Sequence, residues 1–393
     1  MRLPKGFVSS GIRAGLRKKR PDLALIVAEG GADAAAIFTR NKFLAAPVVL
    51  SKQALAKSGG RVKGVVANAG CANAITGKEG MESARRVRAR AAELLACREE
   101  EIFLASTGVI GVQLDDAKVR RNLPAAVTRL SASGVEATSH AILTTDVGPK
   151  VAQASFTWNG RRGRLVGIAK GAGMIHPDMA TMLAFLMTDA PATPQFLRRA
   201  LKEAADRSFN AISVDGDTST NDTVLLMASG KIGGEKMSGD AGTESFRKAL
   251  GEVCRQLAWM IVRDGEGATR VLQIEVTGAK SDADAKRAAH AVGTSPLVKT
   301  AVYGGDPNWG RILAAVGRSG AKFSPARISL KAGGVSLVIG GAPASYREKD
   351  AAKAFAKERV DLRVDLGVGS GSALLMVSDL GHDYVSVNAD YRS

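Results

Sequence analysis

The sequence predicts a mixed α/β protein in which some of the strands pair antiparallel. Through the first 180 residues, short apolar runs typical of strands alternate with stretches of helical periodicity. The dipeptide Asn159–Gly160 separates two strand-like segments and indicates a hairpin turn. Closely spaced strand-like segments return after Arg327, which argues against a purely parallel sheet.

The expected elements follow from local patterns. Apolar runs predict strands at residues 23–29, 34–39, 62–70 and 101–107, and helical spacing predicts a helix over 79–97. After residue 180 the segment TMLAFLM reads as a strand. Thr193 and Pro194 then mark a helix start, because threonine caps helices and proline fits their first turn.

The C-terminal part is expected to form a smaller α/β subdomain from about 280 to 393, although no Pro- or Ser-rich linker marks its boundary. Residues 283–316 look helical, and Asp306 before Pro307 is expected to cap a helix start within them. Strand pairs and a further helix follow. The layers of the fold are therefore predicted to mix α and β elements throughout.

The composition limits the class of partner. A chain of 393 residues is long enough for two or three domains, and 55 Lys and Arg against 38 Asp and Glu give a net charge of +17. A positive charge of this size suggests nucleic acids or anionic substrates as partners. The densest basic clusters, Arg17–Arg20 and Arg85–Arg90, are not interleaved with aromatic residues. We therefore expect a solvated surface and no nucleic-acid partner.

Cysteine usage and hydropathy predict a soluble, cytoplasmic protein with no membrane partner. Cys71, Cys97 and Cys254 are too few and too scattered for a disulfide framework or a thiolate metal site. The first residues contain no apolar segment like that of a signal peptide. No window approaches the roughly 20 apolar residues that span a bilayer.

Several known site types are excluded by spacing. Residues 367–371 lack the dinucleotide-binding pattern, and residues 77–80 lack the Ser or Thr of a P-loop. Residues 214–222 look like a calcium loop, but Thr220 replaces its glycine and Leu226 stands where its glutamate is needed. The four histidines show no metal-binding or triad spacing. We expect no metal and no redox cofactor.

Thr181 lies where a glycine-spaced loop, residues 170–180, meets the apolar segment TMLAFLM. A strand-start threonine explains this position, because β-branched residues suit strands. The alternative is a nucleophile. Without a histidine base, its hydroxyl would need the α-amine of an N-terminal threonine, with a pKa of about 7.7–8.0, as proton acceptor. That mechanism requires cleavage of the Ala180–Thr181 bond.

Distinctive segments run in order along nearly the whole chain: FTRNKFLAAPVVLSK (38–52), NAGCANAITGKEG (68–80), STGVIG (106–111), TTDVGPK (144–150), KGAGMIHPDMATMLAF (170–185), SVDGDTSTNDT (213–223), EGATR (266–270), VKTAVYGGDPNWGRILAAVGR (298–318) and NADYRS (388–393). Together they resemble the bifunctional ornithine acetyltransferase / N-acetylglutamate synthase family (glutamate N-acetyltransferase) of arginine biosynthesis. Cys71 departs from the family, which more often has asparagine there.

The resemblance implies a self-processing N-terminal-threonine acyltransferase of the ornithine acetyltransferase/DmpA-like fold. Cleavage between Ala180 and Thr181 would give an α chain of residues 1–180 and a β chain of residues 181–393, associated as an α2β2 heterotetramer. Thr181 would carry the acetyl group of N2-acetyl-L-ornithine to L-glutamate by a ping-pong mechanism. L-ornithine and N-acetyl-L-glutamate would be the products. Many members also accept acetyl-CoA as donor, so it is a candidate co-substrate.

The resemblance also implies roles for individual residues. Thr107 and Gly108 match the oxyanion hole, where a hydroxyl and a backbone N–H face the developing negative charge. The substrate-binding residues would be Thr181, Lys170, Glu266, Asn388, Ser393 and one of Thr144 and Thr145. A lysine suits a substrate carboxylate and a glutamate suits an amine.

Two other functions remain open. A related self-cleaving aminopeptidase or amidase would use water instead of glutamate to resolve the acyl-enzyme. A basic nucleic-acid-binding protein would show salt-sensitive binding without acetyl transfer.

Overall fold

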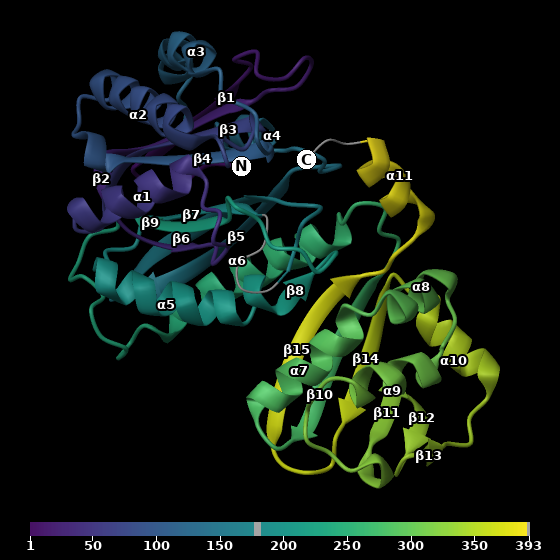
Figure 1. Ribbon diagram of the computed structural model, residues 1–393. Coiled ribbons are helices and arrows are strands. Elements are labelled where there is room, and N and C mark those ends of the chain that lie inside the picture. The colour runs from purple at the N-terminus through teal and green to yellow at the C-terminus, as the bar shows by residue number, and fades with distance from the viewer. Residues whose placement is uncertain (177–181, 391–393) are drawn as a thin grey trace. The chain divides into compact units, whose positions relative to one another are not determined.

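The computed structural model describes residues 1–176 and 182–390. These residues form two compact units, each with its own sheet (Figure 1). Among the described residues, the first unit contains Met1–Asn210 and Asp217–Ile261, and the second contains Ala211–Gly216 and residues 262–390. The predicted mixed α/β class is confirmed, since both sheets combine parallel and antiparallel pairs.

The eight-stranded sheet of the first unit has two layers joined by one long strand. Strand β2 (Leu23–Phe38) pairs with β3 (Arg61–Cys71) along its first part and with β9 (Thr223–Ala228) along its last part. The register shifts between Val27 and Ala32, so β2 can bend there and pass between layers. The prediction of two separate strands is therefore wrong, because this glycine-containing segment forms a bulge and not a turn.

Apolar side chains of the two layers pack against each other. One layer holds β1 (Phe7–Ile12), β3 and β4 (Ile102–Val109), and the other holds β9, β7 (Leu183–Thr188), β6 (Arg161–Lys170) and β5 (Lys150–Trp158). The core between them includes Ile26, Val65, Phe103, Ile168, Phe185 and Leu225. The strand ends are consequently held in fixed positions by a continuous apolar core.

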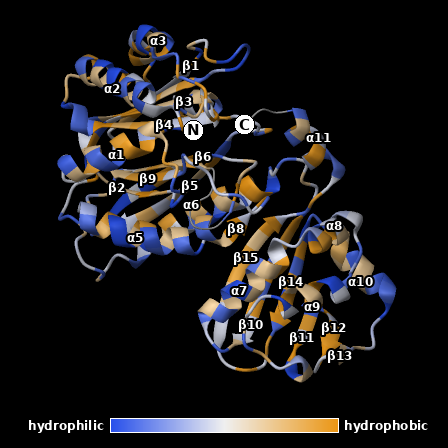
Figure 2. Cartoon of the chain, in the orientation of Figure 1, coloured by the Kyte–Doolittle hydropathy of each residue, from blue (hydrophilic) through white to orange (hydrophobic). Residues whose placement is uncertain are grey.

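Helices cover the outer faces of both layers, so apolar segments lie inside and hydrophilic helix faces outside (Figure 2). Helices α1 (Ala46–Lys57), α2 (Gly77–Leu94) and α3 (Asp116–Thr128) share a core with the layer of β1 and β3. On the other side are α5 (Pro194–Asp206) and α6 (Glu244–Arg263). In α6, Val253 and Leu257 lie against Gly167 of β6. The short helix α4 (Val135–Ala141) packs on β1 and β2.

Local signals account for several turns and caps. Asn159 and Gly160 have positive φ angles of 48° and 73° and connect the antiparallel strands β5 and β6, which confirms the predicted hairpin. The Thr193 hydroxyl accepts a hydrogen bond from the Phe196 N–H at 3.3 Å, which confirms the predicted cap of α5.

The expected cap at Asp306 is wrong. Helix α9 (Trp309–Gly317) is capped by Asn308, whose Oδ1 accepts a hydrogen bond from the Arg311 N–H at 3.1 Å. The Asp306 carboxylate instead accepts a hydrogen bond from Asn308 Nδ2 at 3.0 Å. Asp306 therefore orients the capping residue and does not cap the helix itself.

The second unit is built on a seven-stranded sheet in the order β13-β12-β11-β14-β10-β15-β8. The strands are β8 (Ile212–Ser213), β10 (Val271–Ala279), β11 (Ser329–Ala332), β12 (Val335–Ile339), β13 (Ala342–Pro343), β14 (Arg359–Asp365) and β15 (Gly371–Ser378). Its helices are α7 (Asp282–Gly293), α8 (Pro296–Gly304), α9, α10 (Glu348–Phe355) and α11 (His382–Asp390). Strand β10 precedes residue 280, where the sequence placed a boundary. Among the helices of the described chain, none has the length and apolar character needed to cross a membrane.

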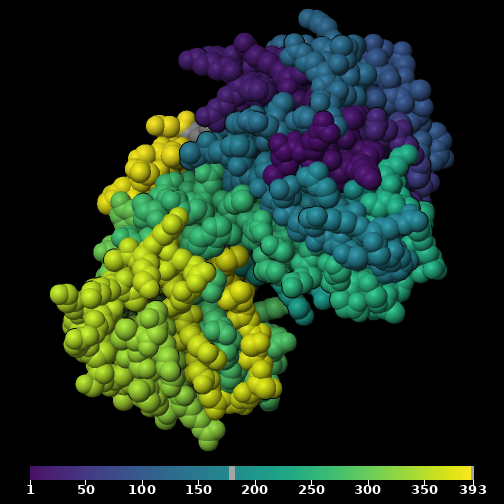
Figure 3. All heavy atoms as spheres, turned by 180° about the vertical axis from the view of Figure 1, so that it is seen from behind, coloured from purple at the N-terminus to yellow at the C-terminus, as the bar shows by residue number. Residues whose placement is uncertain are grey.

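The N-terminal segment is fixed to the first unit. The Ser229 hydroxyl donates a hydrogen bond to the Lys5 carbonyl at 2.6 Å, and the Lys5 N–H donates to Asp189 Oδ2 at 3.4 Å. Figure 3 shows these purple residues lying against the teal and green surface of the same unit. Asp189, which directly follows β7, is thus held from both its own layer and the N-terminal segment.

Candidate active site

Three neighbouring strands of the first unit have a terminus at the same end of the sheet. Lys170, the last residue of β6, pairs with Leu183, the first residue of β7, and Leu183 pairs with Thr223, the first residue of β9. The predicted nucleophile Thr181 and its neighbour Ala180 lie outside the described residues. Met182, the next residue of the chain, is described and buried. The cleavage and the nucleophile therefore stay predictions.

Two predicted site residues, Thr107 and Lys170, come together from opposite layers. Lys170 Nζ donates a hydrogen bond to Thr107 Oγ1 at 3.2 Å, across 63 residues of sequence. Both residues are buried, with 2% and 4% of their surface exposed. Because the lysine donates to this hydroxyl, the hydroxyl's own hydrogen is free to be donated elsewhere.

Gly108 occupies a position that excludes a side chain. Its φ angle is +131°, and an added Cβ would lie 2.4 Å from the Gly70 carbonyl carbon and 2.6 Å from the Cys71 nitrogen. The close approach arises where the register of β3 against β4 shifts at Gly70 and Cys71. Only glycine fits here, which suits the predicted role of a backbone group in the oxyanion hole.

Asp146 connects the chain before β5 to the chain after β6 through a buried ion pair and backbone hydrogen bonds. Its Oδ1 accepts hydrogen bonds from Lys150 Nζ and from the Gly171 N–H, each at 2.7 Å, and its Oδ2 accepts from the Thr144 N–H at 3.0 Å. Burial alone would raise the pKa of this carboxyl. The positive charges of Lys170 and Lys150 and these hydrogen bonds outweigh burial and hold the pKa far below its usual value.

The structure fixes Thr144 beside Asp146, but the choice between Thr144 and Thr145 as substrate contact stays open. The segment that carries them is also bound by Arg17, which donates hydrogen bonds to the Leu143 carbonyl at 2.5 Å and to the Thr144 carbonyl at 3.3 Å. From the sequence, Arg17 is expected to lie in a solvated basic cluster. No local signal could have revealed a contact that spans 126 residues.

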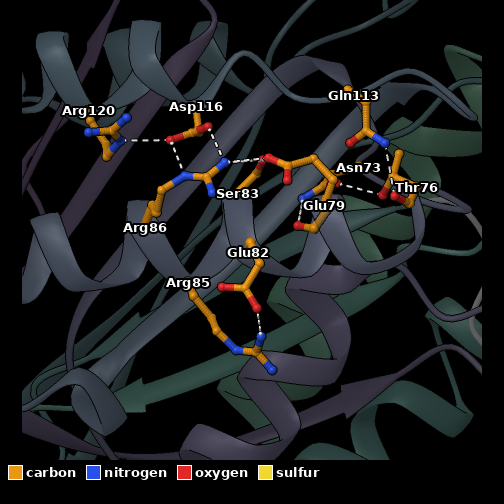
Figure 4. Close-up of polar contacts among 11 residues, drawn as sticks. Asn73, Thr76, Glu79, Glu82, Ser83, Arg85, Arg86, Gln113, Asp116 and Arg120 are labelled. Carbon is orange, nitrogen blue, oxygen red and sulfur yellow. Dashed lines mark hydrogen bonds and ion pairs between the residues drawn. The ribbon is translucent and has the colours of Figure 1, made fainter.

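The arginine-rich stretch of α2 is paired with carboxylates (Figure 4). Arg86 binds Asp116 at 2.9 Å and Glu79 at 2.6 Å. Its neighbours in the same stretch form the ion pairs Arg85–Glu82, Arg88–Glu99 and Arg90–Glu93. Because each of these charges has a nearby counter-charge, the stretch is a poor candidate for a phosphate-binding surface.

The segment that precedes β9 joins the strand ends to the chain after Thr181. Asn221 Nδ2 donates hydrogen bonds to the carbonyls of Ala72 at 2.6 Å and of Ser106 at 2.8 Å. The next residue, Asp222, accepts a hydrogen bond from the Met182 N–H through Oδ1 at 2.9 Å. In the sequence, neither residue stands out from the rest of the calcium-like segment 214–222.

Cys71, where the sequence departs from the resembling family, is buried and packed. Burial raises the pKa of its thiol, and its Sγ donates a hydrogen bond to the Val112 carbonyl at 3.3 Å. Its own carbonyl accepts a hydrogen bond from Asn68 Nδ2 at 2.9 Å. The residue therefore has the environment of an inert, structural thiol.

Two further predicted substrate contacts meet in the second unit. Asn388 Nδ2, on α11, donates a hydrogen bond to Glu266 Oε2 at 2.9 Å. Ser393, the remaining predicted contact, lies outside the described residues. The carboxylate and the amide are thus adjacent, although the chain between them spans 122 residues.

Comparisons with known proteins point to one family over nearly the whole chain. The model of the ArgJ family matches residues 8–393. The arginine biosynthesis bifunctional protein ArgJ of Geobacter sulfurreducens is 47% identical over 99% of both chains, and that of Chlorobaculum tepidum is 44% identical over 99% of this chain and 96% of its own. The crystal structure of ArgJ from Bacillus halodurans is 40% identical with a TM-score of 0.51, over 53% of this chain and 98% of that chain.

Proposed function

The chain belongs to the ArgJ family, and we propose on this basis that it transfers an acetyl group from N2-acetyl-L-ornithine to L-glutamate in arginine biosynthesis. The observation that carries the proposal at the site is the hydrogen bond from Lys170 to Thr107. It places a cation and a hydroxyl donor together at the end of β6, after which the chain continues toward Thr181. An acyl-transfer site needs such donors where negative charge develops.

In this proposal Thr181 becomes the nucleophile after cleavage of the Ala180–Thr181 bond. The β chain would then contain 213 of the 393 residues, or 54% of the chain. The Bacillus halodurans chain, which is matched over 98% of its length by 53% of this one, has the size expected of such a fragment. This agreement supports processing of the chain into two parts.

The proposed reaction has two acyl-transfer steps. The Thr181 hydroxyl gives its proton to the free α-amine and attacks the acetyl carbonyl carbon of acetylornithine. The oxyanion that forms is stabilised by the free hydrogen of Thr107 and by the Gly108 N–H. The carbon–nitrogen bond then breaks, ornithine leaves with the proton, and an acetyl-threonine ester remains. The amine of glutamate attacks this ester, and its proton returns to Thr181 Oγ through the α-amine.

The remaining parts of the proposal rest on the resemblance. Lys170 would bind a substrate carboxylate, and Thr144 or Thr145, Glu266, Asn388 and Ser393 would complete substrate binding. The chains would assemble as an α2β2 heterotetramer in the cytoplasm. Acetyl-CoA would serve as a second donor, with no metal or other cofactor.

Incubation with acetylornithine, in the presence and absence of glutamate, tests the proposal. We expect acetylglutamate and ornithine to form together, and only when glutamate is present. The related aminopeptidase or amidase activity would instead release acetate and ornithine at the same rate without glutamate. That outcome would contradict the acetyltransferase assignment while leaving an acyl-enzyme mechanism in place.

A further inference from the structure

Asp222 has an unusual environment for a buried carboxyl group. The residue has no exposed surface, and its Oδ1 accepts the hydrogen bond from the Met182 N–H. Its Oδ2 is also buried and has no hydrogen-bond partner among the described residues. Buried polar atoms in folded proteins are nearly always hydrogen-bonded, so an open oxygen on the carboxyl that binds Met182, the residue after Thr181, calls for a functional explanation.

Asp189 shows that burial alone does not produce this environment. It directly follows β7, at the end of the strand opposite Met182, and 2% of its surface is exposed. Burial raises its pKa also, but both of its oxygens are hydrogen-bonded, Oδ1 to the Arg164 N–H at 2.8 Å and Oδ2 to the Lys5 N–H. Asp222 therefore differs in its open oxygen and in its hydrogen bond to Met182, which follows Thr181 in the chain.

The charge balance around Asp222 favours a cationic partner. Burial raises the pKa of the carboxyl well above its usual value, although the Met182 N–H, Ser219 and the charge of Lys170 act in the opposite direction. Lys170 is shared, because its charge also acts on Asp146, which is bonded to Lys150. A buried carboxylate without its own counter-charge is costly, and a positive group at Oδ2 would remove that cost.

We propose that Asp222 is a positioning residue for the nucleophile, in which Oδ2 accepts a hydrogen bond from the α-amino group that cleavage before Thr181 releases. Oδ1 meanwhile holds the N–H of the next residue, so one carboxyl fixes two consecutive nitrogens of the chain. The inference rests on the proposed function. When the amine takes the proton of the Thr181 hydroxyl, the carboxylate stabilises the ammonium group that forms, and no further reactant is needed.

The pH profile of kcat/KM for acetyl transfer tests this role in Asp222→Asn, with Asp189→Asn as the matched buried control. Removal of the carboxylate charge should lower the pKa of the amine, because an adjacent opposite charge favours the ammonium form. The acid limb of the profile should move to lower pH by roughly one unit. We also expect kcat to fall at least about tenfold with little change in KM. Asp189→Asn should keep the wild-type limb.

If Asp222→Asn is not processed, residues 1–180 and residues 181–393 can be co-expressed as two chains and measured in the same way, once mass spectrometry shows that the initiator Met before Thr181 has been removed and the α-amine is free. An unchanged acid limb in a processed or co-expressed Asp222→Asn enzyme would overturn the inference. Loss of the folded state in Asp222→Asn but not in Asp189→Asn, seen by circular dichroism, would also overturn it, because Asp222 would then be structural. Absence of acetylglutamate with the wild-type protein would instead contradict the proposed function.

Discussion

Asp146 and Asp222 lie in the same unit, both fully or almost fully buried, and the charge of Lys170 acts on both. Asp146 is bonded to Lys150 Nζ and to two backbone N–H groups, and its pKa is far below the usual value. Asp222 accepts the Met182 N–H and is also contacted by Ser219, but its Oδ2 stays open, and burial holds its pKa well above the usual value. Two similarly buried carboxyls thus have pKa values shifted in opposite directions because their partners differ.

The difference distinguishes Asp146, which stabilises the fold, from Asp222, which is proposed to act in the reaction. Both carboxylate oxygens of Asp146 are hydrogen-bonded, and they connect Thr144 to Gly171, the first residue after β6. Asp222 is an incompletely satisfied group that binds the N–H of Met182, the residue directly after the proposed nucleophile. Strongly perturbed pKa values of this second kind are concentrated at functional sites, where stability is given up for activity. The comparison can be tested by changing each carboxyl and the residues it contacts.

The largest expected effect is on stability, from Asp146→Asn. The substitution removes the carboxylate that pairs with the buried Lys150, so we expect the free energy of unfolding to fall by about 3–5 kcal/mol. Urea unfolding followed by circular dichroism measures the change. The double variant Asp146→Asn/Lys150→Met removes both charges and should recover most of the loss. A loss below about 1 kcal/mol in the single variant would show that the pair is not structurally important.

Thr107→Ala tests whether the hydroxyl that Lys170 contacts serves the reaction. Loss of one oxyanion-hole donor should lower kcat by about 10²–10³-fold with KM little changed. Thr107→Ser keeps the hydroxyl and is the control, with activity expected within a few-fold of wild type. Steady-state kinetics of acetylglutamate formation give both parameters. A change confined to KM would argue against the oxyanion role.

The pH dependence of stability should differ in sign between the two carboxyls. The folded pKa of Asp146 is lowered, so its stabilisation is fully present above the unfolded value of about 3.9 and is lost gradually as the pH falls from that value through the lower folded pKa. The folded pKa of Asp222 is raised, so in a chain without the released α-amine its destabilisation develops as the pH rises above about 3.9. Between about pH 8 and pH 3, Asp222→Asn in an unprocessed Thr181→Ala chain should therefore converge with its Thr181→Ala parent, whereas Asp146→Asn and wild type should only begin to converge below about pH 4. Parallel curves would contradict the assigned directions of the two pKa shifts.

The smallest expected effect is again on stability, from Asp222→Asn at neutral pH in a Thr181→Ala chain, which is expected to stay unprocessed and to release no α-amine. The amide keeps the shape of the carboxyl and can still accept the Met182 N–H, while the buried acid is removed. We expect the free energy of unfolding to rise by roughly 0.5–2 kcal/mol relative to the Thr181→Ala parent. Thermal unfolding beside Asp189→Asn measures the change. Equal destabilisation of both variants would remove the distinction between Asp222 and an ordinary buried carboxyl.

Local features of the fold could be predicted from the sequence, because a few neighbouring residues determine them. The Asn159–Gly160 hairpin and the Thr193 cap are examples. The single strand β2 was missed because Gly30 and Gly31 suit a turn as well as a bulge, and only pairing with both β3 and β9 decides between them.

The site could be predicted only in part for a similar reason. The resemblance identified Thr107 and Lys170, but their contact depends on the packing of two layers. Arg17 and Asp222 could not be assigned, because their partners lie 126 and 40 residues away. A pattern read along the chain carries no information about such distances.

The central claim is that Thr181 becomes the first residue of a chain and carries the acetyl group. Mass spectrometry of the denatured protein after brief exposure to acetylornithine without glutamate tests it most directly. The account predicts a fragment that begins TMLAF and gains the mass of one acetyl group, located on Thr181 and lost when glutamate is added. An active protein that remains a single chain, or an acetyl group located on another residue, would contradict it.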